Sequence, residues 1–118
     1  MRYNYNHSTL MGRLTKDPET VDLGDKKIKT SFTLAIDRDY VKEDGSRDTD
    51  FIPVCFWGKP AELTQKLLAK GSPVLVWGRI NVRNYTNKEN QEKWITEVIG
   101  DSFQVLQKKS SEETTDKK

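Results

Sequence analysis

Hydrophobic and polar residues alternate with a period of two along several stretches of the chain, and this pattern predicts β-strands. The clearest case is residues 73–85, in which one face carries Val74, Val76, Ile80 and Val82. The opposite face of the same stretch carries Leu75, Trp77, Arg79, Asn81, Arg83 and Tyr85. We expect the aliphatic face to lie in a core and the mixed face to lie at the surface.

Two further stretches, 27–37 and 49–57, alternate in the same way and are predicted to be half-buried strands. Their expected core faces are Phe32, Leu34 and Ile36 in the first, and Ile52, Val54 and Phe56 in the second. Less regular strands are expected over 2–15 and 93–106, with a brief extension at 20–23 between two turns. The charged stretch 38–48 contains Gly45 at its centre, which is typical of a long hairpin loop.

One segment has a helical pattern, from Pro60 to Lys70. Proline suits the first position of a helix, and Gly71 suits the position just after the end. The apolar stripe of this helix is expected to consist of Leu63, Leu67 and Leu68.

The order of three strands, one helix and two strands predicts an all-β fold. We expect a five-stranded Greek-key barrel of the OB type, with one helix between strands 3 and 4. An open sandwich is the alternative. The domain is expected to cover residues 1–106, and the polar tail 107–118 is expected to be disordered.

Length and composition support a single domain and exclude a membrane-spanning protein. The chain has 118 residues, a formal charge of +2 and one cysteine, Cys55, which we expect to be a small packing residue. The sequence has neither an apolar signal segment nor a stretch of about 18 apolar residues, so we expect a cytoplasmic protein. The net charge is too small to indicate a ligand.

Local charge is more informative than net charge. Residues 77–88 contain no carboxylate, and the mixed face of this strand combines aromatic rings with guanidinium groups. Rings can stack on nucleobases, and arginine can neutralise phosphate. This combination favours a flexible polyanion with planar bases as the ligand.

Short motifs in a fixed order extend this interpretation across residues 8–106. They are Gly12-Arg13-Leu14, Asp17-Pro18-Glu19, Trp57-Gly58-Lys59, Gly78-Arg79-Ile80 and Thr96-Glu97-Val98. In their order and spacing they resemble the bacterial-type single-stranded DNA-binding proteins. The resemblance implies sequence-tolerant binding of single-stranded DNA in replication, recombination or repair, without enzymatic activity and without a metal or nucleotide cofactor.

The resemblance also implies a set of binding residues. The positions that stack bases in the family are aromatic here too, and they are Tyr40, Phe51, Trp57 and Tyr85. The matching basic positions are Arg38, Lys42, Lys59, Lys70, Arg79 and Arg83. We add Trp77 and Lys88, the two ends of the carboxylate-free segment, although a subunit contact would suit the indole of Trp77 equally well.

The family forms homotetramers, so a homo-oligomer is expected, but two departures bear on partners. Ser8 and Thr9 stand where the family has apolar residues in a strand that pairs between subunits, which leaves dimer and tetramer open. The sequence ends in Thr115-Asp116-Lys117-Lys118, and so lacks the acidic, aromatic-tipped tail with which long family members recruit partner proteins. We therefore expect a short form of the family.

Three alternatives compete with this interpretation. Phe51 and Trp57 share a strand face and could be core residues, because aromatic side chains are usually buried. The chain could instead be a primosome-accessory OB-fold dimer. The acidic residues of 37–50 could hold Mg²⁺ in a nuclease, although we favour a solvated loop. His7 is the single histidine, so a Ser-His or Cys-His dyad would rest on a residue near the terminus.

Overall fold

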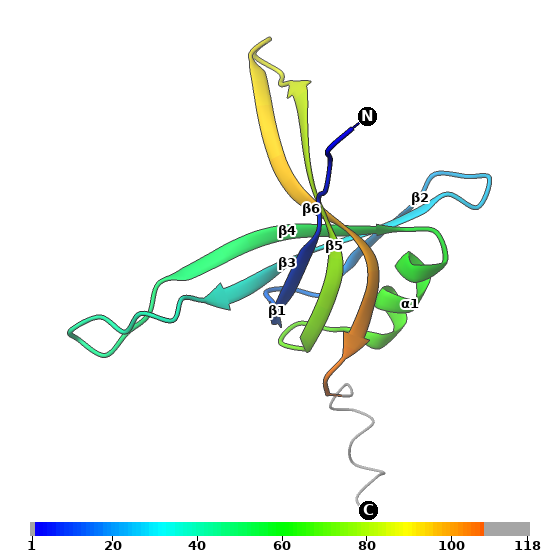
Figure 1. Cartoon of the computed structure of the whole chain (residues 1–118). Coiled ribbons are helices and arrows are strands. Elements are labelled where there is room, and N and C mark those ends of the chain that lie inside the picture. The colour runs from blue at the N-terminus through cyan, green and yellow to red at the C-terminus, as the bar shows by residue number, and fades with distance from the viewer. Residues whose placement is uncertain (1, 108–118) are drawn as a thin grey trace, which may run out of the picture.

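The computed structural model describes residues 2–107 and consists of six strands and one helix (Figure 1). In chain order the elements are β1 (Ser8–Leu14), β2 (Glu19–Asp22), β3 (Ile28–Asp37), β4 (Thr49–Trp57), α1 (Lys59–Leu67), β5 (Pro73–Thr86) and β6 (Glu92–Val105). The predicted β-rich class with one short helix is confirmed. The sixth strand arises because the predicted extension after the first turn pairs antiparallel with β3. The tail expected to be disordered lies, from residue 108 onward, outside the described residues.

The strand pairings form a closed circuit. β1 pairs antiparallel with β5, β5 pairs with β6, and β4 pairs with β3. A short parallel pairing joins β4 to β6 at Val54 and Val98, and β3 returns to β1 at Leu34 and Leu14. Each strand of this circuit therefore has a neighbour on both sides over part of its length, while β2 lies outside it on the edge of β3.

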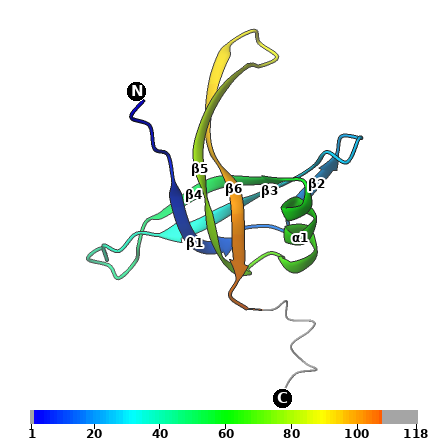
Figure 2. The same cartoon turned by 45° about the vertical axis from the view of Figure 1, so that its right-hand side comes forward.

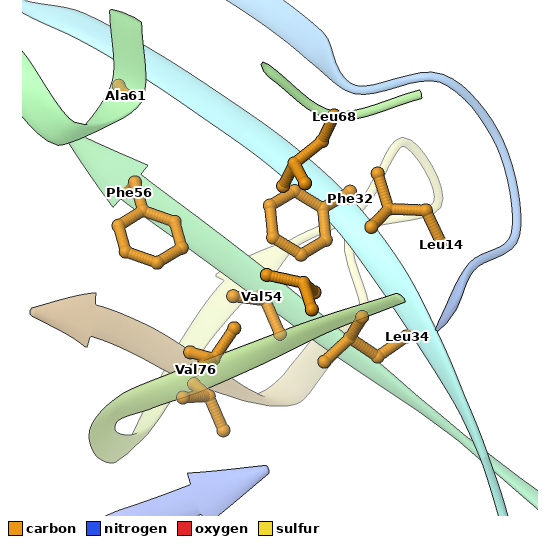
Figure 3. Packing of buried hydrophobic residues seen from close by; sticks show 10 residues of the cluster. Leu14, Phe32, Leu34, Val54, Phe56, Ala61, Leu68 and Val76 are labelled. Atoms are coloured by element: carbon orange, nitrogen blue, oxygen red, sulfur yellow. The ribbon is translucent and has the colours of Figure 1, made fainter. Parts of the chain in front are cut away.

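The core lies inside this circuit, and alternate residues of several strands meet there (Figure 3). Its members are Leu14, Phe32, Leu34, Val54, Phe56, Ala61, Leu68, Val74, Val76 and Val98. The ring of Phe56 occupies the centre, 5.5 Å from the Phe103 ring and 6.1 Å from the Phe32 ring. Of the core faces predicted for β3 and β4, Phe32, Leu34, Val54 and Phe56 are buried, while Ile36 and Ile52 are partly buried and pack against the core.

The helix packs on the circuit through a different face from the one predicted. Leu68, just after the last turn, is buried, but Leu63 and Leu67 are 39% and 42% exposed. The buried helical residues are Ala61 and Thr64. The face with Ala61 packs against β3, where the hydroxyl of the buried Thr30 donates a hydrogen bond of 2.8 Å to the carbonyl oxygen of Ala61. A small residue at position 61 allows that close approach.

The second half of β5 and the first half of β6 form a hairpin, residues 80–98, that projects from the body of the molecule (Figures 1 and 2). We call it the arm. Val74 and Val76 are buried as predicted, but Ile80 and Val82 are 47% and 55% exposed, so their predicted place in the core is wrong. In the arm β5 pairs with β6 alone, so no further strand covers these aliphatic side chains.

A bulge marks the point where β6 leaves the body. Trp77 pairs with Ser102 and Gly78 pairs with Gly100, which leaves Asp101 as an extra residue in β6. A bulge of this kind increases the local twist and bends the strand. Among the described residues α1 is too short and too polar to cross a membrane, and no other helix is present.

Candidate nucleic-acid interface

The four aromatic side chains proposed to stack bases all lie at the surface. Their exposed fractions are 73% for Tyr40, 64% for Phe51, 43% for Trp57 and 43% for Tyr85. The alternative that placed Phe51 and Trp57 in the core is therefore wrong. Alternation explains the result, because Val54 and Phe56 on the opposite face of β4 fill the core instead.

The rings are distributed along the molecule and do not form one cluster. Phe51 and Trp57 lie on the outer face of β4, six positions apart, which in a strand corresponds to about 20 Å. Tyr40 lies in the β3–β4 loop and Tyr85 lies near the end of β5 in the arm. Within residues 2–107 no two of these four rings are in contact. Such spacing suits an extended strand that meets one ring at a time.

The β3–β4 loop that carries Tyr40 is held by its own hydrogen bonds. The guanidinium of Arg47 donates to the carbonyl oxygens of Arg38 and Asp39, at 3.0 and 2.7 Å. The amide of Arg38 also donates to the carbonyl of Asp48. Tyr40 is therefore presented on an ordered hairpin although its ring has little cover.

A groove of about 430 Å³ lies between the outer face of β3 and β4 and the lower part of the arm. Its lining includes Lys29, Ser31, Thr33, Pro53 and Cys55 from the two strands, Arg83, Ile95 and Glu97 from the arm, and Thr15, Lys16 and Asp17 from the turn after β1. Basic, hydroxyl and apolar side chains line this groove together with the carboxylates of Asp17, Glu19 and Glu97, of which Glu97 is paired with Arg83. The basic side chains suit the charged phosphates of a polynucleotide, and the apolar ones suit its planar bases.

A second groove, of about 320 Å³, shares Pro53 and Glu97 with the first. It is mostly apolar and is formed where β1, β4 and the arm meet, with Leu10, Phe51, Pro53 and Ile80 among its lining residues. Phe51 and Pro53 therefore stand beside an apolar hollow as well as on the outer face of β4.

Three of the predicted basic residues are paired with carboxylates. Arg38 contacts Asp50 at 2.9 Å, Lys42 contacts Asp48 at 3.1 Å, and Arg83 contacts Glu97 at 3.0 Å. The guanidinium of Arg38 holds the pKa of the Asp50 carboxyl below its ordinary value by hydrogen bonding. The first two pairs are exposed and screened by solvent, so a phosphate could replace the carboxylate at little cost.

The Arg83 pair differs from the other two because Glu97 is buried, with 8% of its surface exposed. Its Oε2 atom accepts hydrogen bonds from Arg83 and from the amide of Asn81, at 3.0 and 3.2 Å. The carboxylate therefore fixes the direction of the Arg83 side chain on the wall of the groove.

The remaining basic candidates, Lys59, Lys70, Arg79 and Lys88, are exposed and take part in no ion pair within residues 2–107. The structure does not bring them together. Lys59 begins α1 and Lys70 follows its end, while Arg79 and Lys88 belong to the arm and its tip, and both views place α1 far from that tip (Figures 1 and 2).

Trp77 is half-buried, next to the bulge and paired in register with Thr9 of β1. Its indole has less free surface than the four exposed rings. Trp94, for which a structural role is expected at the base of the last hairpin, is 67% exposed on the arm.

Sequence reasoning missed Lys29. Its Nζ atom lies over the Trp57 ring, 5.4 Å from the centroid, and its side chain lines the larger groove. The alternation of residues 27–37 already placed Lys29 on the outer face. The strand register that sets it beside Trp57 was not visible in the sequence, and it is provided by the pairing of β3 with β4.

Four of the acidic residues in and beside the β3–β4 loop make contacts within this region. Asp44 accepts hydrogen bonds from Ser46, which lower its pKa, and Asp37 accepts one of 2.7 Å from Thr49. Asp48 and Asp50 are paired with cations as described. In the described part of the chain, no three His, Cys, Asp or Glu side chains are grouped so that they could hold a metal ion.

Comparison with known proteins agrees with this chemistry. Residues 5–106 match the family model described as Single-strand binding protein family. A Staphylococcus aureus protein named Single-stranded DNA-binding protein 1 is 45% identical over 109 residues, which are 92% of this chain and 70% of that protein. An Enterococcus faecalis protein named Single-stranded DNA-binding protein is 40% identical over 108 residues, 92% of this chain and 57% of that protein.

Proposed function

The chain belongs to the single-strand binding protein family, and from this premise we propose that it binds single-stranded DNA by stacking bases on exposed rings and by contacting phosphates with basic side chains. The family is one of binding proteins, so the chain is not an enzyme. The proposed stacking residues are Tyr40, Phe51, Trp57 and Tyr85. The proposed phosphate contacts are Arg38, Lys42, Lys59, Lys70, Arg79, Arg83, Lys88 and, from its position beside Trp57, Lys29.

The fold that accompanies this function is an OB-type barrel. The closed circuit of pairings through β1, β5, β6, β4 and β3 supports it, as does the single helix between β4 and β5. OB-folds bind oligonucleotides across a strand face and its adjoining loops, which here correspond to β4, the β3–β4 loop and the arm.

The observation that carries the proposal is the exposure of Phe51, a wholly apolar ring with 64% of its surface in solvent beside the apolar groove. Leaving such a ring uncovered forgoes the free energy of burial, and a stacked base would recover it. Stacking is worth about 1–3 kcal/mol per base and is sequence-tolerant, because every base has a π-face. Duplex DNA hides those faces, so single strands are preferred.

We infer a homotetramer in the cytoplasm that coats and protects exposed strands in replication, recombination or repair. A primosome-accessory dimer would also bind single strands. Light scattering in solution separates the two assemblies, since four chains of 13.6 kDa differ twofold in mass from two.

Anisotropy of a labelled oligo-dT tests the binding mechanism. Phe51→Ala and Tyr85→Ala should each weaken binding by about fivefold or more, equally for oligo-dT and for a mixed sequence, because one stacking contact is lost. Leu63→Ala is the matched control, since it removes an exposed apolar side chain from α1 and should bind like the wild type. Unchanged affinity in both ring variants would exclude the stacking mechanism.

A further inference from the structure

Two tyrosines in the segment before β1 are more exposed than any other large apolar side chain among residues 2–107. Tyr3 is 88% exposed and Tyr5 is 92% exposed. Neither ring contributes to the core, so their apolar area contributes nothing to folding. Both lie outside the set of aromatic positions described above.

The segment is nevertheless fastened to the arm. The side-chain amide of Asn6 donates to the carbonyl oxygen of Ile80 at 2.8 Å, and its Oδ1 atom accepts from the amide of Ile80 at 3.0 Å. These two bonds continue the pairing of β1 with β5, which ends at Ser8 and Gly78. Asn6 thus extends the ladder by two residues through its side chain and orders the residues on either side.

The rings beside this clamp have the geometry of a platform. The rings of Tyr5 and His7 are stacked, with centroids 6.2 Å apart and planes inclined by 23°. Side chains two residues apart share a side when the backbone is extended, as in a strand. Tyr3 continues the same alternation, so three planar side chains follow one another along the segment.

Charge around the clamp favours a polyanion. Residues 2–12 contain Arg2 and no carboxylate, and residues 77–88, in β5 and the turn after it, contain Arg79, Arg83 and Lys88 and no carboxylate either. Figures 1 and 2 both show the N-terminal segment rising from β1 on the side from which the arm projects. Two segments without acidic residues, each with aromatic rings, therefore meet at Ile80.

We propose that Tyr3 and Tyr5 form an additional stacking platform for nucleobases, positioned by the Asn6 clamp, so that single-stranded DNA continues from the arm onto the N-terminal segment. This inference rests on the proposed function and adds a contact site to it. Tyr3 and Tyr5 contact the bases, and Asn6 is a positioning residue that acts through them.

Binding of labelled oligo-dT by three variants tests the platform. The double variant Tyr3→Ala with Tyr5→Ala should bind about twenty-fivefold or more weakly, because each stacked ring contributes about fivefold or more and the two losses multiply. Tyr3→Phe with Tyr5→Phe keeps both π-faces and should recover the affinity. Asn6→Ala leaves the rings intact but releases the segment, and should lose part of the affinity. Leu63→Ala with Leu67→Ala on α1 controls for the loss of two exposed apolar side chains.

Photo-crosslinking gives a second readout that does not depend on affinity. Oligo-dT containing 5-iododeoxyuridine should crosslink to the peptide that contains Tyr3 and Tyr5, and Asn6→Ala should reduce that crosslink. If the wild-type protein binds, but the double alanine variant binds equally well and no such crosslink forms, the platform is overturned and the proposed function stands. A change of particle mass in the double variant with unchanged affinity per protomer also overturns the platform. Failure of the wild type to bind overturns both.

Discussion

The Nζ atom of Lys29 lies over the indole of Trp57, 5.4 Å from the ring centroid. At an exposed site such a cation–π contact is worth about 0.5–1 kcal/mol. A phosphate carries a full negative charge and makes a stronger, charge-assisted bond with an ammonium group. Trp57 therefore holds Lys29 close to the place where a stacked base would bring its phosphate, and the ammonium can move from ring to phosphate at small cost.

The first prediction concerns this lysine. Lys29→Met keeps the length of the side chain and removes its charge. Binding to oligo-dT should weaken for all sequences alike, and the slope of log K against log salt should become shallower by about 0.7, the value for one phosphate contact on a single strand. Lys66→Met on α1 is the matched control and should leave the slope as it is in the wild type. Equal slopes in all three proteins would show that Lys29 contacts no phosphate.

The strands could be predicted because alternation is a local property. Leu34, Val54 and Val76 each belong to a series of apolar residues spaced two apart in its own strand, and each lies in the core as expected. The same rule failed for Ile80 and Val82, since alternation indicates that a face is apolar but not whether another strand covers it. The prediction of the buried face of α1 was wrong for a related reason. The hydrogen bond from Thr30 to Ala61 joins residues 31 positions apart, and no helical pattern reveals it.

The candidate site was predictable in part. Matching motifs indicated the aromatic positions, and the strand pattern explains why Phe51 and Trp57 share the outer face of β4. The ion pairs of Arg38 and Lys42 depend on the folding of the β3–β4 loop, which brings residues 6–12 positions apart into contact. Charge counts along the chain do not contain that information.

The second prediction concerns the buried carboxylate of Glu97. Arg83→Met removes its cation and leaves the amide of Asn81 as the remaining donor described for it. The free energy of unfolding should fall by about 1–3 kcal/mol, the cost of leaving a buried acceptor poorly satisfied. Urea unfolding followed by tryptophan fluorescence measures the change.

Two further variants make that result interpretable. Arg79→Met removes an exposed arginine four residues earlier in the same strand, and should change stability by no more than about 0.5 kcal/mol. Adding Glu97→Gln to Arg83→Met removes the uncompensated charge and should restore part of the loss. If Arg83→Met were no less stable than Arg79→Met, the pair would have no structural role.

The third prediction concerns Gly100, which packs against the central ring of the core. A Cβ atom at this position would overlap the Phe56 ring, with its Cε1 atom only 2.8 Å away. Gly100→Ala must therefore displace a buried ring in a tightly packed core and should destabilise the protein by about 1–3 kcal/mol. Ser102→Ala, an exposed change two residues further along β6, is the control. A stability equal to that of the control would show that Phe56 can move freely.

The fourth prediction concerns the thiol of Cys55, which is 3% exposed. Burial raises the pKa of this thiol, and nearby Glu97 adds to the effect. Thiol reagents react with the thiolate, so the native protein should be labelled much more slowly than the unfolded chain at the same pH. As the pH is increased, the labelling rate of the native protein should begin to rise at a higher pH than the labelling rate of the unfolded chain. Labelling of the native protein at the rate found in urea would contradict the buried position.

The same raised pKa determines the sign of a pH effect on stability. The unfolded chain loses the thiol proton at the ordinary cysteine pKa, whereas the folded chain keeps it to higher pH. The stability contributed by the protonated thiol is therefore complete below the ordinary pKa and is lost as the pH rises through the raised one. Unfolding in urea at several alkaline pH values, for the wild type and for Cys55→Ala, isolates the contribution of the thiol, because all other groups are the same in both proteins. The wild type should lose more stability than the variant as the pH increases, and parallel curves would show that the thiol does not contribute.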